Sequence, residues 1–133
     1  MTQRDVVLRW IEQIAKVVAR LLNGPGPGDL DLAADQVDEA IVFHLGPLHS
    51  LVQRMEVSTA ADLVHDPDRL FGYAQLLSLR AAVEQARGES RSAETSLRAL
   101  AFAREAVARA PDAPPAWGEW VAEAERMRRG GKP

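Results

Sequence analysis

Apolar residues recur along most of the chain with the spacing of an α-helix. In residues 3–23 they follow one another at intervals of three and four, and further apolar positions widen the stripe. The stripe consists of Val7, Ile11, Ile14, Val18 and Leu21, and the flanking positions are Val6, Trp10, Val17 and Leu22. So broad an apolar surface needs more than one partner, so we expect this helix at the centre of a bundle or in a dimer interface.

The sequence NGPGPGD at residues 23–29 ends the first helix, because proline lacks an N–H donor and glycine accepts left-handed geometry. A phosphate-binding loop would need a preceding strand and a closing lysine and serine, which are missing. We therefore interpret residues 24–28 as a helix breaker. A second helix is predicted from Asp29, as its N-cap, to about Leu45. Its expected inner face is Leu30, Ala33, Val37, Ala40, Ile41 and His44.

The next segments are shorter. Gly46 and Pro47 break the second helix, and a short segment, residues 48–55, follows. Ser58 or Thr59 is the expected cap of another short helix that runs through Val64. Whether residues 48–66 pack as a lid or within the bundle stays open.

Two long helices are predicted in the second half. The first begins at Pro67 after Asp66 and ends near Gly88, with Leu70, Tyr73, Ala74, Leu77, Ala81 and Val83 facing inward. Its partner, residues 90–110, is expected to bury Ala93, Leu97, Leu100, Ala101 and Val107 beside a small-residue face of Ser96, Ala99, Ala103, Ala106 and Ala110. Small residues let helix backbones approach closely, so we expect a tight antiparallel hairpin.

A last helix is predicted after Pro111, with an apolar face of Trp117, Trp120, Val121, Ala124 and Met127, and residues 129–133 are expected to fray. The whole is one all-α domain, a helical bundle of about five to six helices over residues 1–133. It comprises a long apolar helix (1–23), an acidic middle (29–66) and a tetratricopeptide-like hairpin with a capping helix (67–128).

Charge and composition narrow the function. Residues 29–66 hold eight acidic residues and one basic residue, and no segment is basic enough to bind nucleic acid. Cysteine is absent, which removes disulfides and thiolate metal sites. Charges interrupt the N-terminal helix, so we expect no signal peptide, no stable membrane insertion and a cytoplasmic protein.

Candidate catalytic chemistry is sparse. Asp62 and His65 lie three residues apart and, with Asp66, form the one candidate metal site, but a fourth ligand is missing. His44 and His49 are five apart, which does not place two ligands on one helix face. No serine has a nucleophile motif, so we expect no catalytic residues and no cofactor.

Several segments resemble a known family. Asp5, Arg9, Ile11, Glu12 and Gln13, followed by ARLL at 19–22, are similar to the opening of a family of short, all-helical bacterial proteins with a domain of unknown function. The resemblance continues through QVDEAIVFHLG at 36–46 and the hairpin of residues 67–111. It implies an all-helical fold and no activity. The GPGPG insert departs from the more polar connection expected in that family.

The hairpin can be compared with a tetratricopeptide unit of about 34 residues. Counting back from Pro111, Ala106 and Ala99 fit the positions for small residues, whereas Ala103 stands where an aromatic residue is expected. Gly88 lies too far from Pro111 for a standard turn, and no second copy precedes it. The sequence therefore predicts a packing motif rather than a peptide-binding array.

These features favour a non-enzymatic module for protein association. We expect a homodimer, or a complex with another protein, through the first helix or the last one. The candidate interface consists of Val7, Trp10, Ile11, Ile14, Val18, Leu21, Trp117 and Trp120. The alternatives are a small metal-dependent enzyme or a protein that lies on a membrane surface through its first helix.

Overall fold

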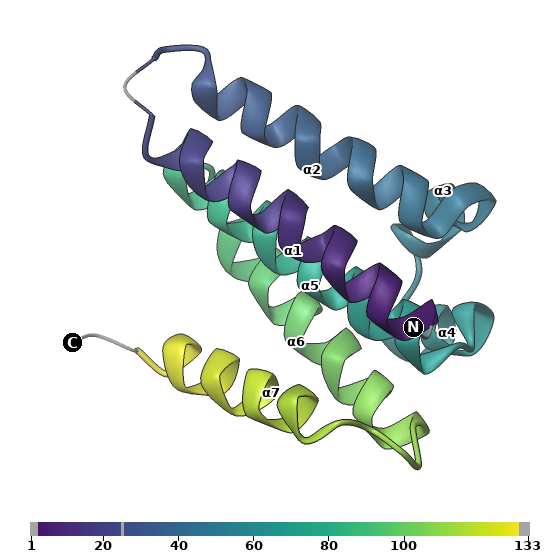
Figure 1. Ribbon diagram of the computed structural model, residues 1–133. Coiled ribbons are helices and arrows are strands. Elements are labelled where there is room, and N and C mark those ends of the chain that lie inside the picture. Colours follow the sequence, from purple (N-terminus) through teal and green to yellow (C-terminus); the bar gives the residue numbers. More distant parts are fainter. Residues whose placement is uncertain (1–2, 25, 131–133) are drawn as a thin grey trace.

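The computed structural model describes residues 3–24 and 26–130, and every regular element in that part of the chain is helical (Figure 1). The longer helices are α1 (Gln3–Leu22), α2 (Asp29–Leu45), α4 (Val57–Val64), α5 (Pro67–Ala86), α6 (Ser92–Arg109) and α7 (Pro115–Arg128). A 3-10 turn η1 (Gly46–Leu48) and the short α3 (His49–Val52) join α2 to α4. The predicted all-α bundle is confirmed. The predicted fraying falls mainly on residues 131–133, which lie outside the described residues.

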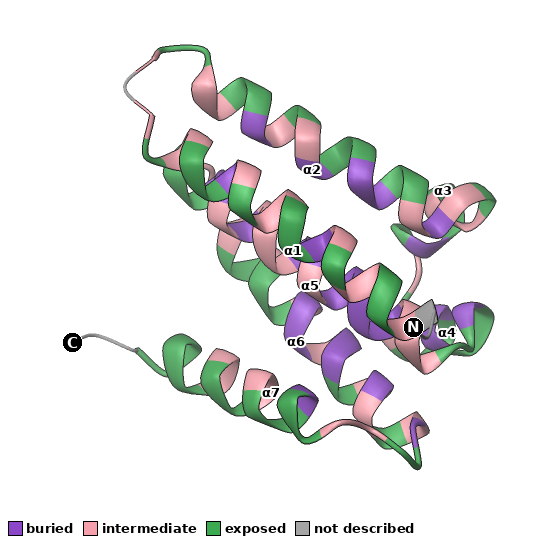
Figure 2. Ribbon diagram, in the orientation of Figure 1, coloured by how far each residue is buried: buried purple, intermediate pink, exposed green. Residues whose placement is uncertain are grey.

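Helix α5 is the centre of the bundle. It makes its most extensive contact with α6 and packs on α1 and α2 as well. Its inner face is buried as predicted, at Leu70, Tyr73, Ala74, Leu77, Ala81 and Val83. Buried residues gather where the helices face one another (Figure 2). The core therefore runs along α5, and α1 and α2 form a layer on one side of it.

The face of α6 that meets α5 is the small-residue face apart from Ser96, which is exposed, and the predicted inner face was wrong in part. Ala93 is exposed and Leu97 keeps 47% of its surface exposed. The deciding residue is Phe102, which is fully buried and lies 4.9 Å from the ring of Tyr73 in a T-shaped contact. The buried residues of α6 are Ala99, Leu100, Phe102, Ala103 and Ala106. The small residues around Phe102 let α6 approach α5.

One predicted helix start is confirmed. The Oδ1 atom of Asp66 accepts a hydrogen bond from the backbone N–H of Asp68 at 3.1 Å, which satisfies an open donor of α5. Pro67 follows as the first helical residue, where its missing N–H costs no hydrogen bond.

Two other predicted caps were wrong. Asp29 is the first residue of α2, after Gly28, and its carboxylate accepts from the N–H of Gly26 at 3.0 Å instead. Helix α4 begins at Val57, so neither Ser58 nor Thr59 caps it. The hydroxyl of Ser58 donates to the carboxylate of Glu56 at 2.8 Å instead. Each helix therefore begins before the start that the pattern predicted.

Helix α7 docks through its first turns. The ring of Trp117 stacks on Phe71 with centroids 4.4 Å apart, and Trp120 meets the same ring edge-on at 5.6 Å. Trp117 is buried, whereas Met127, which was predicted on the apolar face, is 59% exposed. The far end of α7 therefore leaves the bundle (Figure 1).

Candidate functional site

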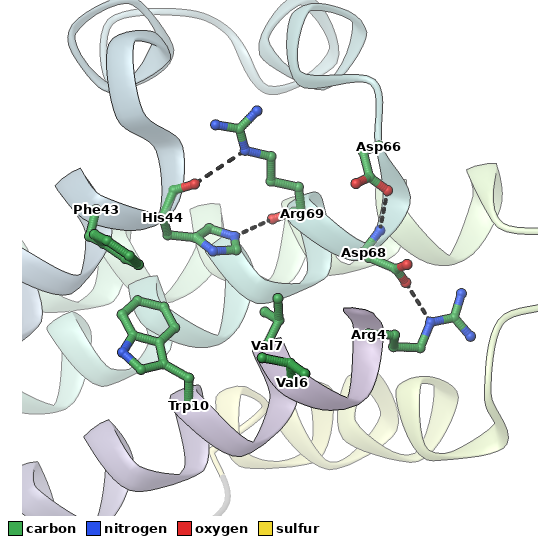
Figure 3. A pocket seen from close by; sticks show the side chains of 9 residues that line it. All are labelled: Arg4, Val6, Val7, Trp10, Phe43, His44, Asp66, Asp68 and Arg69. Carbon is green, nitrogen blue, oxygen red and sulfur yellow. Dashed lines mark hydrogen bonds and ion pairs between the residues drawn. The ribbon is translucent and has the colours of Figure 1, made fainter. Parts of the chain in front are cut away.

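A groove of about 550 Å³ opens where the first turns of α1, the end of α2 and the start of α5 meet (Figure 3). Its lining divides into an apolar wall and a polar end. The apolar wall is Val6, Val7, Trp10 and Phe43, and the polar end is Arg4, His44, Asp66, Asp68 and Arg69. The groove thus combines residues from three helices that are far apart in the sequence.

The apolar wall exposes two large side chains. Phe43 is 77% exposed and Val6 is 52% exposed. Trp10 supports Phe43 from α1, with ring centroids 5.3 Å apart in a tilted arrangement. Burying exposed apolar area gains about 25 cal/mol per Å². An apolar side chain that enters the groove and covers Phe43 is therefore favoured.

The polar end is built around Arg69. Its Nε donates to the carbonyl oxygen of His44 at 3.2 Å and its Nη2 donates to that of Leu45 at 2.7 Å. The last carbonyls of a helix have no partner within the helix, so Arg69 completes the end of α2. This clasp fixes the end of α2 against the first turn of α5.

His44 closes the clasp from the other side. Its Nε2 lies 2.8 Å from the carbonyl oxygen of Arg69, and since a carbonyl only accepts, Nε2 carries the proton. Burial lowers the pKa of His44, and the positive charge of Arg69 acts in the same direction against the hydrogen bond to the carbonyl. His44 is therefore neutral at pH 7 and holds the groove wall in place rather than carrying a charge.

Arg4 closes the groove toward α7. Its Nε donates to Asp68 at 2.6 Å, and Nη2 lies 3.5 Å from the carboxylate of Asp112. Its guanidinium carbon also lies 5.1 Å above the ring of Trp117. Because its guanidinium is already engaged by Asp68 and Asp112, Arg4 forms the rim of the groove and offers no free charge to a ligand.

The predicted interface residues separate into two groups. Ile11, Val18 and Trp117 are buried in the chain's own core, at 4%, 1% and 3% exposure, so they cannot contact a partner. The others are half-buried against the core, namely Val7, Trp10, Ile14, Leu21 and Trp120. Of the eight, only Val7 and Trp10 line the groove.

Sequence reasoning missed Phe43 as a site residue. Phe43 lies one helical turn after Glu39, on the side of α2 that the helical pattern predicts to be polar. An aromatic side chain at a position that the pattern predicts to be solvated was the available signal. Val6 was recognised as a flanking position, but not as an exposed one.

The candidate metal residues do not come together. The Oδ1 atom of Asp62 accepts from Arg109 at 2.7 Å, and Asp66 caps α5. Across residues 3–24 and 26–130, no three His, Asp or Glu side chains are grouped so that they could hold a metal ion. The carboxylates of Asp62 and Asp66 are therefore used within the fold.

Comparisons with known proteins give no family assignment. No family model matches the chain, and no curated protein and no solved structure matches it significantly. The family resemblance and the tetratricopeptide likeness of α5 and α6 stay predictions. Within the described helices, none is long and apolar enough to cross a membrane.

Proposed function

We propose that the chain is a non-enzymatic protein-association module whose α1–α2 groove receives an apolar side chain of a polypeptide partner. The observation that carries the proposal is the exposure of Phe43, 77%, at the edge of an open groove. Aromatic residues beside a pocket are typical centres of protein interfaces. The charged groups of the polar end, Arg4 and Arg69, are already bonded within the fold, which suits the rim of an interface better than a catalytic centre.

The alternatives receive less support. The stripe of α1 that could lie on a membrane faces the core of the bundle, since Ile11 and Val18 are buried. The carboxylate of Asp62 is engaged by Arg109, which leaves the candidate metal site without one of its ligands. Protein association needs only the exposed side chains of Phe43 and Val6, which neither of these observations affects.

Photo-crosslinking tests the proposal. Benzoylphenylalanine replaces Phe43, and the matched control carries it at Leu97 on α6, which is 47% exposed and does not line the groove. We expect a light-dependent adduct with a polypeptide from position 43 that is lost when Trp10→Ser removes the groove wall. Equal adducts from both positions, or no polypeptide adduct from position 43, would contradict the proposal.

A further inference from the structure

His44 presents a hydrogen-bond acceptor that the fold does not use. Its Nε2 donates to the carbonyl oxygen of Arg69, so in the neutral ring the other nitrogen, Nδ1, carries a lone pair and only accepts. Across residues 3–24 and 26–130, no side-chain hydrogen bond involves Nδ1 of His44. It is also not among the buried atoms of that part of the chain that have no partner. Nδ1 is therefore open to solvent.

Solvent reaches Nδ1 from the groove. The edge of the imidazole with Cε1 and Nε2 packs against α5, where a Cβ added at Gly72 would lie 2.8 Å from both atoms. One face of the ring lies over Trp10 of α1, with centroids 6.2 Å apart and planes 19° apart. His44 lines the groove between the exposed Phe43 and the clasp with Arg69 (Figure 3). The lone pair of Nδ1 therefore lies where the apolar wall meets the polar end.

The groups around His44 keep this acceptor available at neutral pH. Burial is the largest cause and lowers the pKa of His44, the charge of Arg69 lowers it further, and the bond to the Arg69 carbonyl and the charge of Asp66 raise it. The other charged groups of the groove, Asp68 on α5 and Arg4 on α1, are bonded to each other. The net effect is an uncharged ring at pH 7, whose Nδ1 accepts.

We infer that the groove selects a tyrosine side chain of the partner, whose hydroxyl donates to Nδ1 of His44; this inference rests on the proposed function. Tyrosine has an apolar ring with its donor at the tip. The groove has the same order, with an apolar wall at Phe43 and then the acceptor of His44. The rings of Phe43 and His44 lie 5.3 and 6.2 Å from the ring of Trp10, within the reach of one phenol side chain.

Other side chains match this order less well. Phenylalanine and leucine would displace water from Nδ1 without supplying a donor, which leaves an acceptor unsatisfied. Tryptophan carries its N–H on the side of the ring and not at the tip. Lysine has a donor at its end, but it would bring a positive charge beside Arg69. Tyrosine is therefore the side chain that fits both parts of the groove.

NMR titration of the isotope-labelled protein tests the selectivity with three probes: N-acetyl-tyrosinamide, its O-methyl derivative, and N-acetyl-phenylalaninamide. The O-methyl derivative keeps the aromatic ring and the oxygen but has no donor. At pH 7.5 we expect the tyrosine probe to shift the amides around Phe43 with a Kd about three- to tenfold lower than the other two, the value of one hydrogen bond.

The pH dependence identifies the acceptor. The preference over the O-methyl probe should disappear as the pH falls through the pKa of His44, read in the same samples from the Cε1 proton of its imidazole. Protonated Nδ1 donates, and the oxygens of both probes can accept from it. His44→Phe should remove the preference at every pH. His65→Gln, at an exposed position outside the groove lining, should keep the preference and its pH dependence.

The inference would be overturned by equal binding of the tyrosine and O-methyl probes at pH 7.5, or by no binding of any probe. A preference that His44→Phe retains, or that persists below the pKa of His44, would also overturn it. Circular dichroism of each variant and at each pH should show the helical fold. Any of these contrary results together with the polypeptide crosslink from position 43 would leave the proposed function standing, with a different side chain in the groove.

Discussion

The Nε2 atom of His44 donates to the carbonyl oxygen of Arg69, and the Nε of Arg69 donates to the carbonyl oxygen of His44. The two residues are 25 positions apart and each binds the backbone of the other. The end of α2 and the first turn of α5 are thereby joined in both directions. Each group depends on the other's backbone, so this joint responds to the protonation of His44 and to the space around its ring.

Stability should depend on pH through His44. Its pKa is lowered in the folded state, mainly by burial, so the unfolded chain binds the proton more readily. The contribution is complete above the ordinary imidazole pKa of about 6.5 and is lost as the pH falls below it. Urea unfolding from about pH 7.5 to 5 should show a decrease in the free energy of unfolding that is smaller in His44→Gln. His65→Gln, at an exposed position, should retain the full decrease; equal slopes in both variants would contradict the assignment.

Gly72→Ala should destabilise the fold. A Cβ at this position would lie 2.8 Å from the His44 ring and 3.2 Å from the Cδ1 atom of Ile11. Both neighbours are packed, so we expect a loss of about 1–3 kcal/mol in thermal or urea unfolding. The matched control is Gly118→Ala in α7, where an added Cβ would meet no neighbouring atom within 4 Å. There alanine should stabilise the helix by about 0.5–1 kcal/mol, and a similar sign for the two substitutions would contradict the packing argument.

His65→Gly should stabilise the protein. His65 has φ 69° and is the one described residue other than glycine with positive φ. It forms a tight turn in which the N–H of Asp66 donates to the carbonyl of Val64 at 2.8 Å. Relief of the backbone strain outweighs the added freedom of the unfolded chain, for a net gain of about 0.5–1 kcal/mol. His65→Ala should give no gain, and a gain from alanine equal to that from glycine would show that the side chain, not the backbone, is strained.

Arg91→Ala should expose the cost of a buried carboxylate. The side chain of Glu84 is 6% exposed, and its Oε2 lies 3.0 Å from Arg91. Removing the guanidinium leaves the carboxylate without that partner, at a cost of about 1–3 kcal/mol. Glu84→Leu in the same background should restore most of the loss. Arg104→Ala breaks a surface pair with Glu125 and should change stability little; an equal loss there would contradict the role of burial.

The sequence was sufficient for the helix at the centre of the bundle. Helix α5 could be read from its pattern because core surrounds most of it, and every residue predicted inward is buried. Helix α6 offers two competing faces, one with Leu97 and one with alanines around Phe102. The choice between them depends on the close approach of α5 and on the Tyr73 contact, which are tertiary facts that periodicity does not contain.

The groove was beyond sequence reasoning for a similar reason. Its walls come from α1, α2 and α5, and its apolar edge is defined by the register that places Trp10 beside Phe43. The broad apolar surface of α1 was visible in the sequence, but how much of it the chain itself covers was not. Ile11 and Val18 turned out to be core residues, and Val6 and Phe43 the exposed ones.

The ion pair of Arg4 with Asp68 joins residues 64 positions apart, and its contact with Asp112 spans 108 positions. A ribosome adds about 5–20 residues per second, so Asp68 is synthesised roughly 3–13 s after Arg4. During that interval the apolar stripe of α1 has no partner from α5. We expect a chaperone to bind the uncovered stripe of α1 during this interval. We also expect slower synthesis to lower the yield of folded protein.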